Sequence, residues 1–240
     1  MNPTPHILAL AADYDSTLAY EGKIAPQTRD ALTRLKASGR KLLLVTGREL
    51  DDLLAIVTEI ELFDGVVSEN GAVLCWPSSG RIELLAPPPP KQLLEELRRR
   101  GIQPLSQGRS IVATTYAQCS DVRKVIAKMG LAMEIIFNRD SAMVLPAGVN
   151  KATGLSQVLR EMQLPAKRVV GVGDAENDEA FLELCGFSVA VANAIPRIKQ
   201  IADMITHQEH GLGVIEVIET ILSGGLEAVS EDKDSAVSTQ

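Results

Sequence analysis

Short runs of apolar residues that alternate with helical patterns over much of the sequence constrain the fold of this chain more than any other feature. The runs cover residues 7–12, 41–45, 63–68, 168–172 and 187–192. Apolar residues at helical spacing lie between or after them, at 26–36, 50–57, 155–162, 176–185, 195–202 and 214–222. Strands that are apolar throughout belong in parallel sheets covered on both faces. The sequence therefore predicts a doubly wound, Rossmann-like α/β fold around a parallel sheet.

The middle of the chain follows a different pattern. Four consecutive prolines at 87–90 cannot form a regular helix or a central strand and indicate a stiff linker. Beyond them, helical patterns at 93–97 and 122–129 mix with strand patterns at 110–116, 133–137 and 142–145. We therefore expect residues 86–149 to form a small α+β cap inserted into an α/β core of residues 1–85 and 150–223. Residues 224–240 have little apolar content and are expected to be a disordered tail.

Composition excludes several classes of protein. The 240 residues carry 24 Lys+Arg against 31 Asp+Glu, a net charge of −7, and only 3% are aromatic, which argues against a nucleic-acid groove. No apolar run approaches the ~18 residues of a membrane span, and the first residues lack a basic, signal-like start. Three widely spaced cysteines, Cys75, Cys119 and Cys185, lie in apolar segments and predict buried, reduced thiols in a cytoplasmic protein.

Two acidic clusters follow apolar runs. Asp13 and Asp15 end the first run, where they could hold a hard cation, keep one proton between them, or form a solvated turn. In the second cluster, Gly173 and Asp174 follow a strand, and an acid at Glu176 would face the pyrophosphate of a dinucleotide. That acid and a missing third glycine exclude the dinucleotide interpretation, leaving a functional acidic site or an ordinary acidic helix start.

Two further positions could contact an anion. Thr46 ends a buried run and is followed by Gly47 and Arg48, which fits either an anion pocket or a helix N-cap. Lys151 precedes a helical pattern, where a cation has the wrong sign for the helix dipole. Either Lys151 has a partner outside its helix, or it is an ordinary solvated lysine.

In this order and spacing, these segments resemble the haloacid dehalogenase superfamily, most closely its Cof-like branch with a type IIB cap. The matching segments are Asp13-Tyr-Asp-Ser-Thr17, Thr46-Gly-Arg48, Glu69-Asn-Gly-Ala72, Gly148-Val-Asn-Lys151 and Gly173-Asp-Ala-Glu-Asn-Asp178. The resemblance spans about residues 6–222. Ser16 stands where glycine is usual, and we expect a local adjustment of the backbone there.

The resemblance implies a magnesium-dependent phosphatase. Asp13 would be the nucleophile that forms an aspartyl phosphate, and Asp15 the general acid and base. Mg²⁺ would be held by Asp13, the main-chain carbonyl of Asp15 and Asp174, with Asp178 orienting a water in the outer shell. The residues implied to contact the substrate are Thr46, Gly47, Arg48, Asn70, Lys151 and Asn177.

The resemblance leaves the substrate and the assembly more open. A small cap favours a small phosphate ester, such as phosphoglycolate or a sugar phosphate, and the polar cap residues Arg109, Arg139 and Asp140 could contact it. A phosphosugar mutase and a non-catalytic phosphometabolite-binding module are the alternatives. No nucleic-acid or membrane partner is expected, and the protein is expected to be a monomer or a homodimer.

Overall fold

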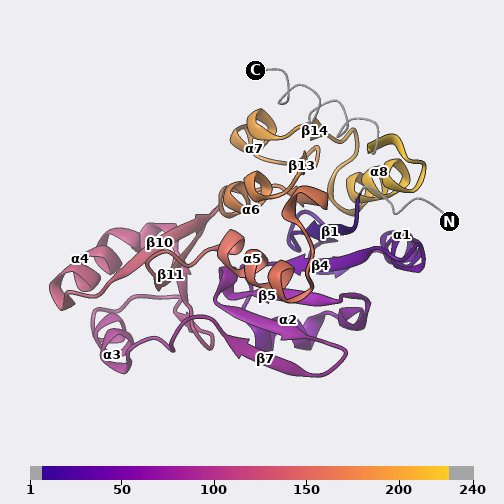
Figure 1. Cartoon of the computed structure of the whole chain (residues 1–240). Helices are drawn as coiled ribbons and strands as arrows, with labels where there is room; N and C mark the ends of the chain where they lie inside the picture. The colour runs from indigo at the N-terminus through magenta and orange to yellow at the C-terminus, as the bar shows by residue number, and fades with distance from the viewer. Residues whose placement is uncertain (1–6, 227–240) are drawn as a thin grey trace, which may run out of the picture.

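The computed structural model describes residues 7–226, which form a larger and a smaller module, each with its own sheet (Figure 1). The larger module is built on an eight-stranded sheet of order β14-β13-β12-β1-β4-β5-β6-β7. Its strands are β1 (Ala9–Ala12), β4 (Lys41–Val45), β5 (Gly65–Ser68), β6 (Val73–Trp76), β7 (Arg81–Leu84), β12 (Val169–Gly173), β13 (Phe187–Ala190) and β14 (Met204–Ile205).

The six strands from β14 to β5 pair in parallel, which confirms the predicted fold class. β1 lies at the centre, with Ala12 opposite Val172 on one side and Leu44 on the other. All four residues of β1 are buried, as expected of a strand covered on both faces. The sheet is not parallel throughout, because β6 and β7 add an antiparallel hairpin at one edge that the sequence patterns did not reveal.

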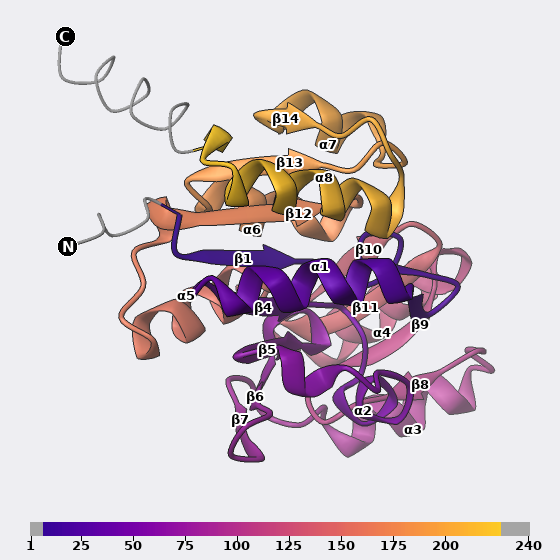
Figure 2. The ribbon, with the colours of Figure 1, turned by 90° about the vertical axis from the view of Figure 1, so that its right-hand side faces the viewer.

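Helices cover both faces of this sheet. α1 and α8 lie side by side on one face, and α5 and α6 lie on the other (Figures 1 and 2). The helices are α1 (Pro26–Ala37), α2 (Leu50–Ile56), α5 (Lys151–Glu161), α6 (Glu179–Leu184), α7 (Pro196–Ile201) and α8 (His210–Leu222). Short 3-10 turns are η1 (Ile60–Leu62), η2 (Glu69–Gly71), η3 (Tyr116–Gln118), η4 (Ala166–Arg168) and η5 (Glu176–Asp178). The helix predicted at 176–185 is thus divided into η5 and α6.

The smaller module has a four-stranded antiparallel sheet of order β10-β11-β9-β8, with two helices beside it. Its elements are α3 (Lys91–Arg99), β8 (Ser106–Gln107), β9 (Val112–Thr115), α4 (Cys119–Met129), β10 (Met133–Asn138) and β11 (Ser141–Pro146). The buried faces of α3 and α4 form a separate apolar cluster that contains Leu93, Leu97 and Val125. This agrees with the α+β pattern expected of the middle segment.

β11 connects the two apolar cores. Successive side chains of a strand point to opposite faces, and Val144 packs in the cluster of the smaller module, whereas Met143 and Leu145 pack in the core of the larger one. The smaller module is therefore docked on the larger one through the open face of its sheet.

A short hairpin, β2 (Ala19–Tyr20) and β3 (Lys23–Ile24), follows β1. Near the other end, Leu226 packs in the main core. Apart from residues 224–226, the tail predicted at 224–240 lies outside the described residues. Within residues 7–226, no helix is both long enough and apolar enough to cross a membrane.

Candidate active site

The polar residues that end the parallel strands meet at one edge of the sheet. Asp13 follows β1 and Asp174 follows β12, its parallel neighbour, so the strand pairing places the two aspartates side by side. Asp178 joins them from η5. One carboxylate oxygen of each of these three buried residues lies within 4.8 Å of the others. β1 runs toward the smaller module, so the cluster lies where the two modules face each other (Figure 2).

Lys151, the first residue of α5, reaches into this cluster. Its side chain is fully buried, and its Nζ donates hydrogen bonds to Oδ1 of Asp13 and Oδ1 of Asp178, both at 2.5 Å. Asn150 caps the N-terminus of α5, because its side chain accepts hydrogen bonds from the backbone N–H groups of Ala152 and Thr153. The structure thus rules out a solvated lysine and supplies the partners that the sequence left unidentified.

Burial and charge shift the ionisation of these groups. Burial would lower the pKa of Lys151, but the carboxylates of Asp13 and Asp178 more than offset this, and the net pKa is raised. Burial also raises the pKa of Asp13 well above its usual range, opposed by Lys151 and reinforced by Asp178 and Asp174. The pKa of Asp174 is raised by burial and by Asp178 as well. The site therefore holds a stable ammonium and more carboxylates than that ammonium neutralises.

This donor set fits a hard divalent cation. Such ions take carboxylate and carbonyl oxygens as ligands, and Asp13, Asp174 and Asp178 supply three carboxylates in close reach. Thr17 fixes Asp174 by donating to its Oδ1 at 3.0 Å. Asp178 accepts a hydrogen bond from the backbone N–H of Asp174 at 2.8 Å, and this bond orients the Asp178 carboxylate.

Asp15 does not join the carboxylate cluster with its side chain. Arg48 binds both of its carboxylate oxygens, through Nε at 2.7 Å and Nη2 at 2.8 Å. The same guanidinium donates to Asp52 at 2.7 Å. Ser16, next along the chain, has φ +62°, a left-handed conformation that favours glycine and that explains the local adjustment expected there. The two aspartates therefore have different partners, Lys151 for Asp13 and Arg48 for Asp15.

The other predicted substrate contacts also meet at this edge. Thr46 is buried after β4, and its Oγ1 accepts the backbone N–H of Arg48 at 3.2 Å. Asn177 Nδ2 donates to Asn70 Oδ1 at 3.0 Å, which leaves Asn70 Nδ2 and Asn177 Oδ1 buried without a protein partner. A Cβ on Gly47 would lie 3.3 Å from Asn177 Nδ2, so this glycine keeps the approach to the amide pair open. Unpaired buried amide groups at a site are suited to contact a polar ligand.

The smaller module contributes one residue that the sequence could not single out. Arg139 lies in the tight turn between β10 and β11, and its Nη2 forms an ion pair with Oδ2 of Asp174. From the sequence, Arg109 and Asp140 are, together with Arg139, the cap residues that could contact the substrate. Arg109 instead pairs with Asp51 at 2.8 Å, outside the carboxylate cluster. Asp140 lies beside Arg139 in the lining of the pocket between the two modules.

Glu69 is a second residue with a role that sequence reasoning missed. It is fully buried in the larger module, and its carboxylate accepts backbone N–H groups of the smaller module from Arg109 at 2.9 Å, Ser110 at 2.7 Å and Ile111 at 3.1 Å. Gly108 passes so close that a Cβ there would lie 2.7 Å from this carboxylate. Glu69 thus attaches the turn between β8 and β9 to the larger module.

A pocket of about 610 Å³ opens between the two modules, and Arg139, which pairs with Asp174 of the carboxylate cluster, is part of its lining. The larger module lines it with residues that include Asp15, Gly47 and Arg48, and the smaller module with residues that include Arg139 and Met143. Pockets of this size hold small metabolites. A ligand in this pocket would contact both modules at once.

Known proteins are similar to this chain in sequence and in fold. A family model described as haloacid dehalogenase-like hydrolase matches residues 10–98 and 117–218. Phosphoglycolate phosphatase 2 of Saccharolobus solfataricus is 34% identical over 235 residues, covering 90% of this chain and 93% of that protein. A haloacid dehalogenase-like hydrolase from Bacteroides thetaiotaomicron aligns with a TM-score of 0.78 at 20% identity, covering 90% and 99%. A subclass IIB sugar phosphatase aligns with a TM-score of 0.71, also at 20% identity, covering 90% and 98%.

The matched segments of the family model include Asp13, Lys151 and Asp174, the residues around which the site is built. They also include most of the smaller module. The suspected resemblance is therefore confirmed, and this chain belongs to the haloacid dehalogenase-like hydrolases.

Proposed function

We propose that this protein is a Mg²⁺-dependent phosphatase that hydrolyses a small phosphate monoester, phosphoglycolate or a close relative of it, through an aspartyl phosphate on Asp13. The family and relatives such as the Saccharolobus enzyme indicate a phosphatase of the haloacid dehalogenase type. The observation that supports the finer proposal is the contact of Lys151 with Asp13 inside a buried cluster of three carboxylates.

The proposed first step is an in-line attack of an Asp13 carboxylate oxygen on phosphorus. The new bond joins Asp13 to phosphorus, and the bond from phosphorus to the ester oxygen breaks. Asp15 gives a proton to that leaving oxygen, for which it must turn from Arg48 toward the pocket that both residues line. Asp15 then takes a proton from the water that attacks the aspartyl phosphate, which restores Asp13 and releases phosphate.

The remaining residues hold the phosphoryl group. Lys151 places a fixed positive charge beside Asp13, and Thr46, with the adjacent Gly47 and Arg48, would contact phosphoryl oxygens at the end of β4. Asn70 Nδ2 is a buried donor without a protein partner, and Asn177 orients that amide by donating from its Nδ2 to Asn70 Oδ1. Transition-state charge on the equatorial oxygens is what such donors stabilise.

Mg²⁺ would be held by Asp13, Asp174 and the main-chain carbonyl of Asp15, with Asp178 orienting a bound water. Once bound, it would supply positive charge that offsets the negative charge of the three carboxylates and of the phosphoryl oxygens. Asp178 already binds Lys151 and the Asp174 backbone, which suits an orienting role rather than a direct ligand.

The module boundaries follow the same proposal. Residues 1–85 and 150–223 would be the catalytic core, and residues 86–149 a type IIB-like cap that closes the pocket over the substrate and excludes water. The cytoplasmic location and the monomeric or homodimeric state stay predictions.

The test is phosphate release from 2-phosphoglycolate and a panel of sugar phosphates, in Mg²⁺ and in chelator. Mg²⁺-dependent turnover with the highest kcat/KM on 2-phosphoglycolate is the expected result. Turnover of a sugar 1-phosphate to its 6-phosphate isomer without phosphate release would instead establish a mutase. Binding of the whole panel without any turnover would leave a binding module.

A further inference from the structure

Arg139 has an unusual placement for a residue of the smaller module. It lies at the tip of the hairpin between β10 and β11, with φ +51°, and its backbone N–H donates to Oε2 of Glu176 at 3.0 Å. Its guanidinium reaches Oδ2 of Asp174, a member of the carboxylate cluster. Two contacts with the larger module, one from the backbone and one from the side chain, therefore fix this arginine above the site.

The charges that line the pocket distinguish Arg139 from the other arginine there. Arg48 belongs to the larger module and is engaged by two carboxylates, with two hydrogen bonds to Asp15 and one to Asp52. Within residues 7–226, Arg139 forms an ion pair with Asp174, and the side chain of Arg139 is 44% exposed. Arg139 is also the only cation that the smaller module contributes to the described lining.

Arg139 pairs with Asp174, which is also one of the residues proposed to hold Mg²⁺. Once Asp174 serves such a cation, the guanidinium loses much of the negative charge that holds it. Released from its ion pair with Asp174, the guanidinium would face the pocket that it lines. A guanidinium in that position is matched in shape and charge by a carboxylate, which it can bind through two parallel hydrogen bonds.

We propose that Arg139 is a specificity-determining residue that binds a carboxylate of the substrate, so that the preferred substrates are short phosphorylated hydroxy acids. This inference rests on the proposed function and adds the residue that recognises the carboxylate of the substrate. Because the guanidinium already contacts the carboxylate cluster, the second anion must lie only a few atoms from phosphorus. A long sugar phosphate would place its distal groups beyond this contact.

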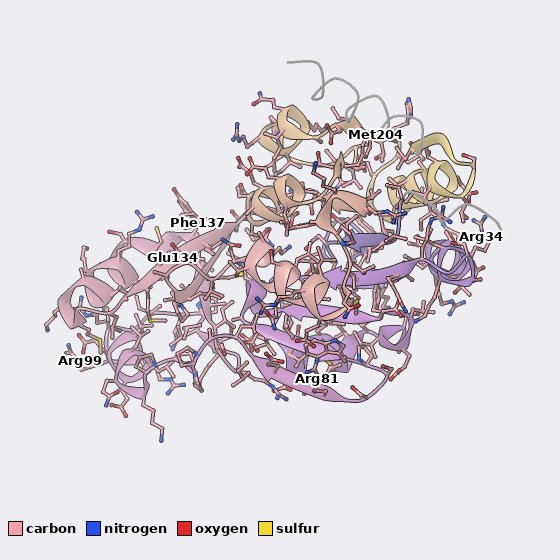
Figure 3. All side chains as sticks on the ribbon, viewed as in Figure 1. Arg34, Arg81, Arg99, Glu134, Phe137 and Met204 are labelled. Carbon is pink, nitrogen blue, oxygen red and sulfur yellow. The ribbon has the colours of Figure 1, made fainter. Side chains whose placement is uncertain are left out.

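The test compares two esters that differ in one group. 2-Phosphoglycolate carries a carboxylate, and 2-hydroxyethyl phosphate carries a hydroxymethyl group at the same position. Arg139→Ala is compared with Arg99→Ala, whose arginine lies on α3 at the outer end of the smaller module and pairs with Glu96 (Figure 3). All variants are assayed at saturating Mg²⁺.

We expect Arg139→Ala to lower kcat/KM for 2-phosphoglycolate by about 10–150-fold, the usual loss for a hydrogen bond to a charged group. The loss should come mainly from KM, and the rate on 2-hydroxyethyl phosphate should change less than ~3-fold, as for an uninvolved surface residue. Arg139→Lys should recover part of the loss, because it keeps the charge but not the paired geometry. Arg99→Ala should leave both substrates unchanged.

An equal loss on both esters, or none on either, would overturn the inference, because Arg139 would then only dock the smaller module. That failure is distinct from failure of the proposed function, in which the wild type would hydrolyse neither ester.

Binding gives a readout that does not depend on turnover. In the Asp13→Asn background, calorimetry with 2-phosphoglycolate should show a Kd that Arg139→Ala weakens by the same factor, with no change for 2-hydroxyethyl phosphate. Mn²⁺ affinity should be unchanged or tighter in Arg139→Ala, because a competing cation is removed from Asp174. Weaker Mn²⁺ binding would show that Arg139 acts by positioning Asp174 and would contradict substrate contact.

Discussion

Nζ of Lys151 lies 2.5 Å from Oδ1 of Asp13 in the interior of the protein, where neither side chain has appreciable contact with water. The same ammonium lies 2.5 Å from Oδ1 of Asp178. One buried cation therefore serves two buried carboxylates, and each carboxylate depends on it.

Lys151→Met should destabilise the metal-free protein by about 3–5 kcal/mol, the usual cost of leaving a buried charge without its partner. The loss should be larger at pH 8 than at pH 5. The pKa of Asp13 is already raised in the folded state, and Lys151 lowers it, so without Lys151 the folded protein loses stability as the pH rises through that raised pKa. Urea unfolding at both pH values measures the effect. Lys124→Met, at an exposed position on α4, is the control, and an equal effect in the two variants would contradict the argument.

Mg²⁺ should stabilise the wild type against heat. A cation bound only to the folded state adds about 2.7 kcal/mol at one hundred times its Kd, which corresponds to about 5–11 °C in Tm for a chain of this size. Asp174→Asn should lose most of this increase, because one carboxylate of the cluster is replaced by an amide. Differential scanning fluorimetry across a Mg²⁺ titration measures it, with Asp30→Asn on the exposed face of α1 as the control. A Mg²⁺ response that survives in Asp174→Asn would place the cation elsewhere.

Glu69→Gln should loosen the contact between the two modules. The amide would direct an NH₂ group at backbone N–H donors that the carboxylate now accepts, at a cost of about 1–3 kcal/mol. Amide hydrogen exchange at residues 109–111 should accelerate by about 10–100-fold, with Glu83→Gln on β7 as the control. Unchanged exchange at these amides would show that Glu69 does not hold the turn between β8 and β9 against the larger module.

The three cysteines should differ in reactivity. Cys75 and Cys185 are buried, and burial raises the pKa of Cys185 to about 12 and that of Cys75 above its usual value. Cys119 is only partly buried, which corrects the expectation of three buried thiols. Iodoacetamide at pH 8 should therefore modify Cys119 in the native protein and the other two only after unfolding. Mass spectrometry of tryptic peptides checks this, and rapid native labelling of Cys185 would contradict it.

Sequence patterns predicted the parts of the fold that depend on local order. The strands that carry Asp13, Thr46 and Asp174 are uniformly apolar, and polar residues at their ends must converge in a parallel sheet. The hairpin of β6 and β7 was not predicted, since its short strands gain their stability from pairing, β6 with β5 and β7 with β6, rather than from a pattern of their own.

The sequence could not resolve which side chains of the site touch. Asp13 and Asp15 have the same chemistry, and only the folded chain shows that one contacts Lys151 and the other Arg48. Glu69 accepts hydrogen bonds from backbone N–H groups about forty residues away, and backbone donors leave no mark in the sequence. Arg139 was one of several polar cap residues until the docking of β10 and β11 placed it on Asp174.

Phosphate release by Asp13→Asn tests the central claim most directly. Wild type, Asp13→Asn and Asp30→Asn are compared on 2-phosphoglycolate and on para-nitrophenyl phosphate at saturating Mg²⁺, with circular dichroism to show that each variant is folded. An amide at residue 13 cannot attack phosphorus, so turnover should fall to the background rate in Asp13→Asn while Asp30→Asn retains the wild-type rate. A folded Asp13→Asn protein with near wild-type turnover would contradict the proposed nucleophile.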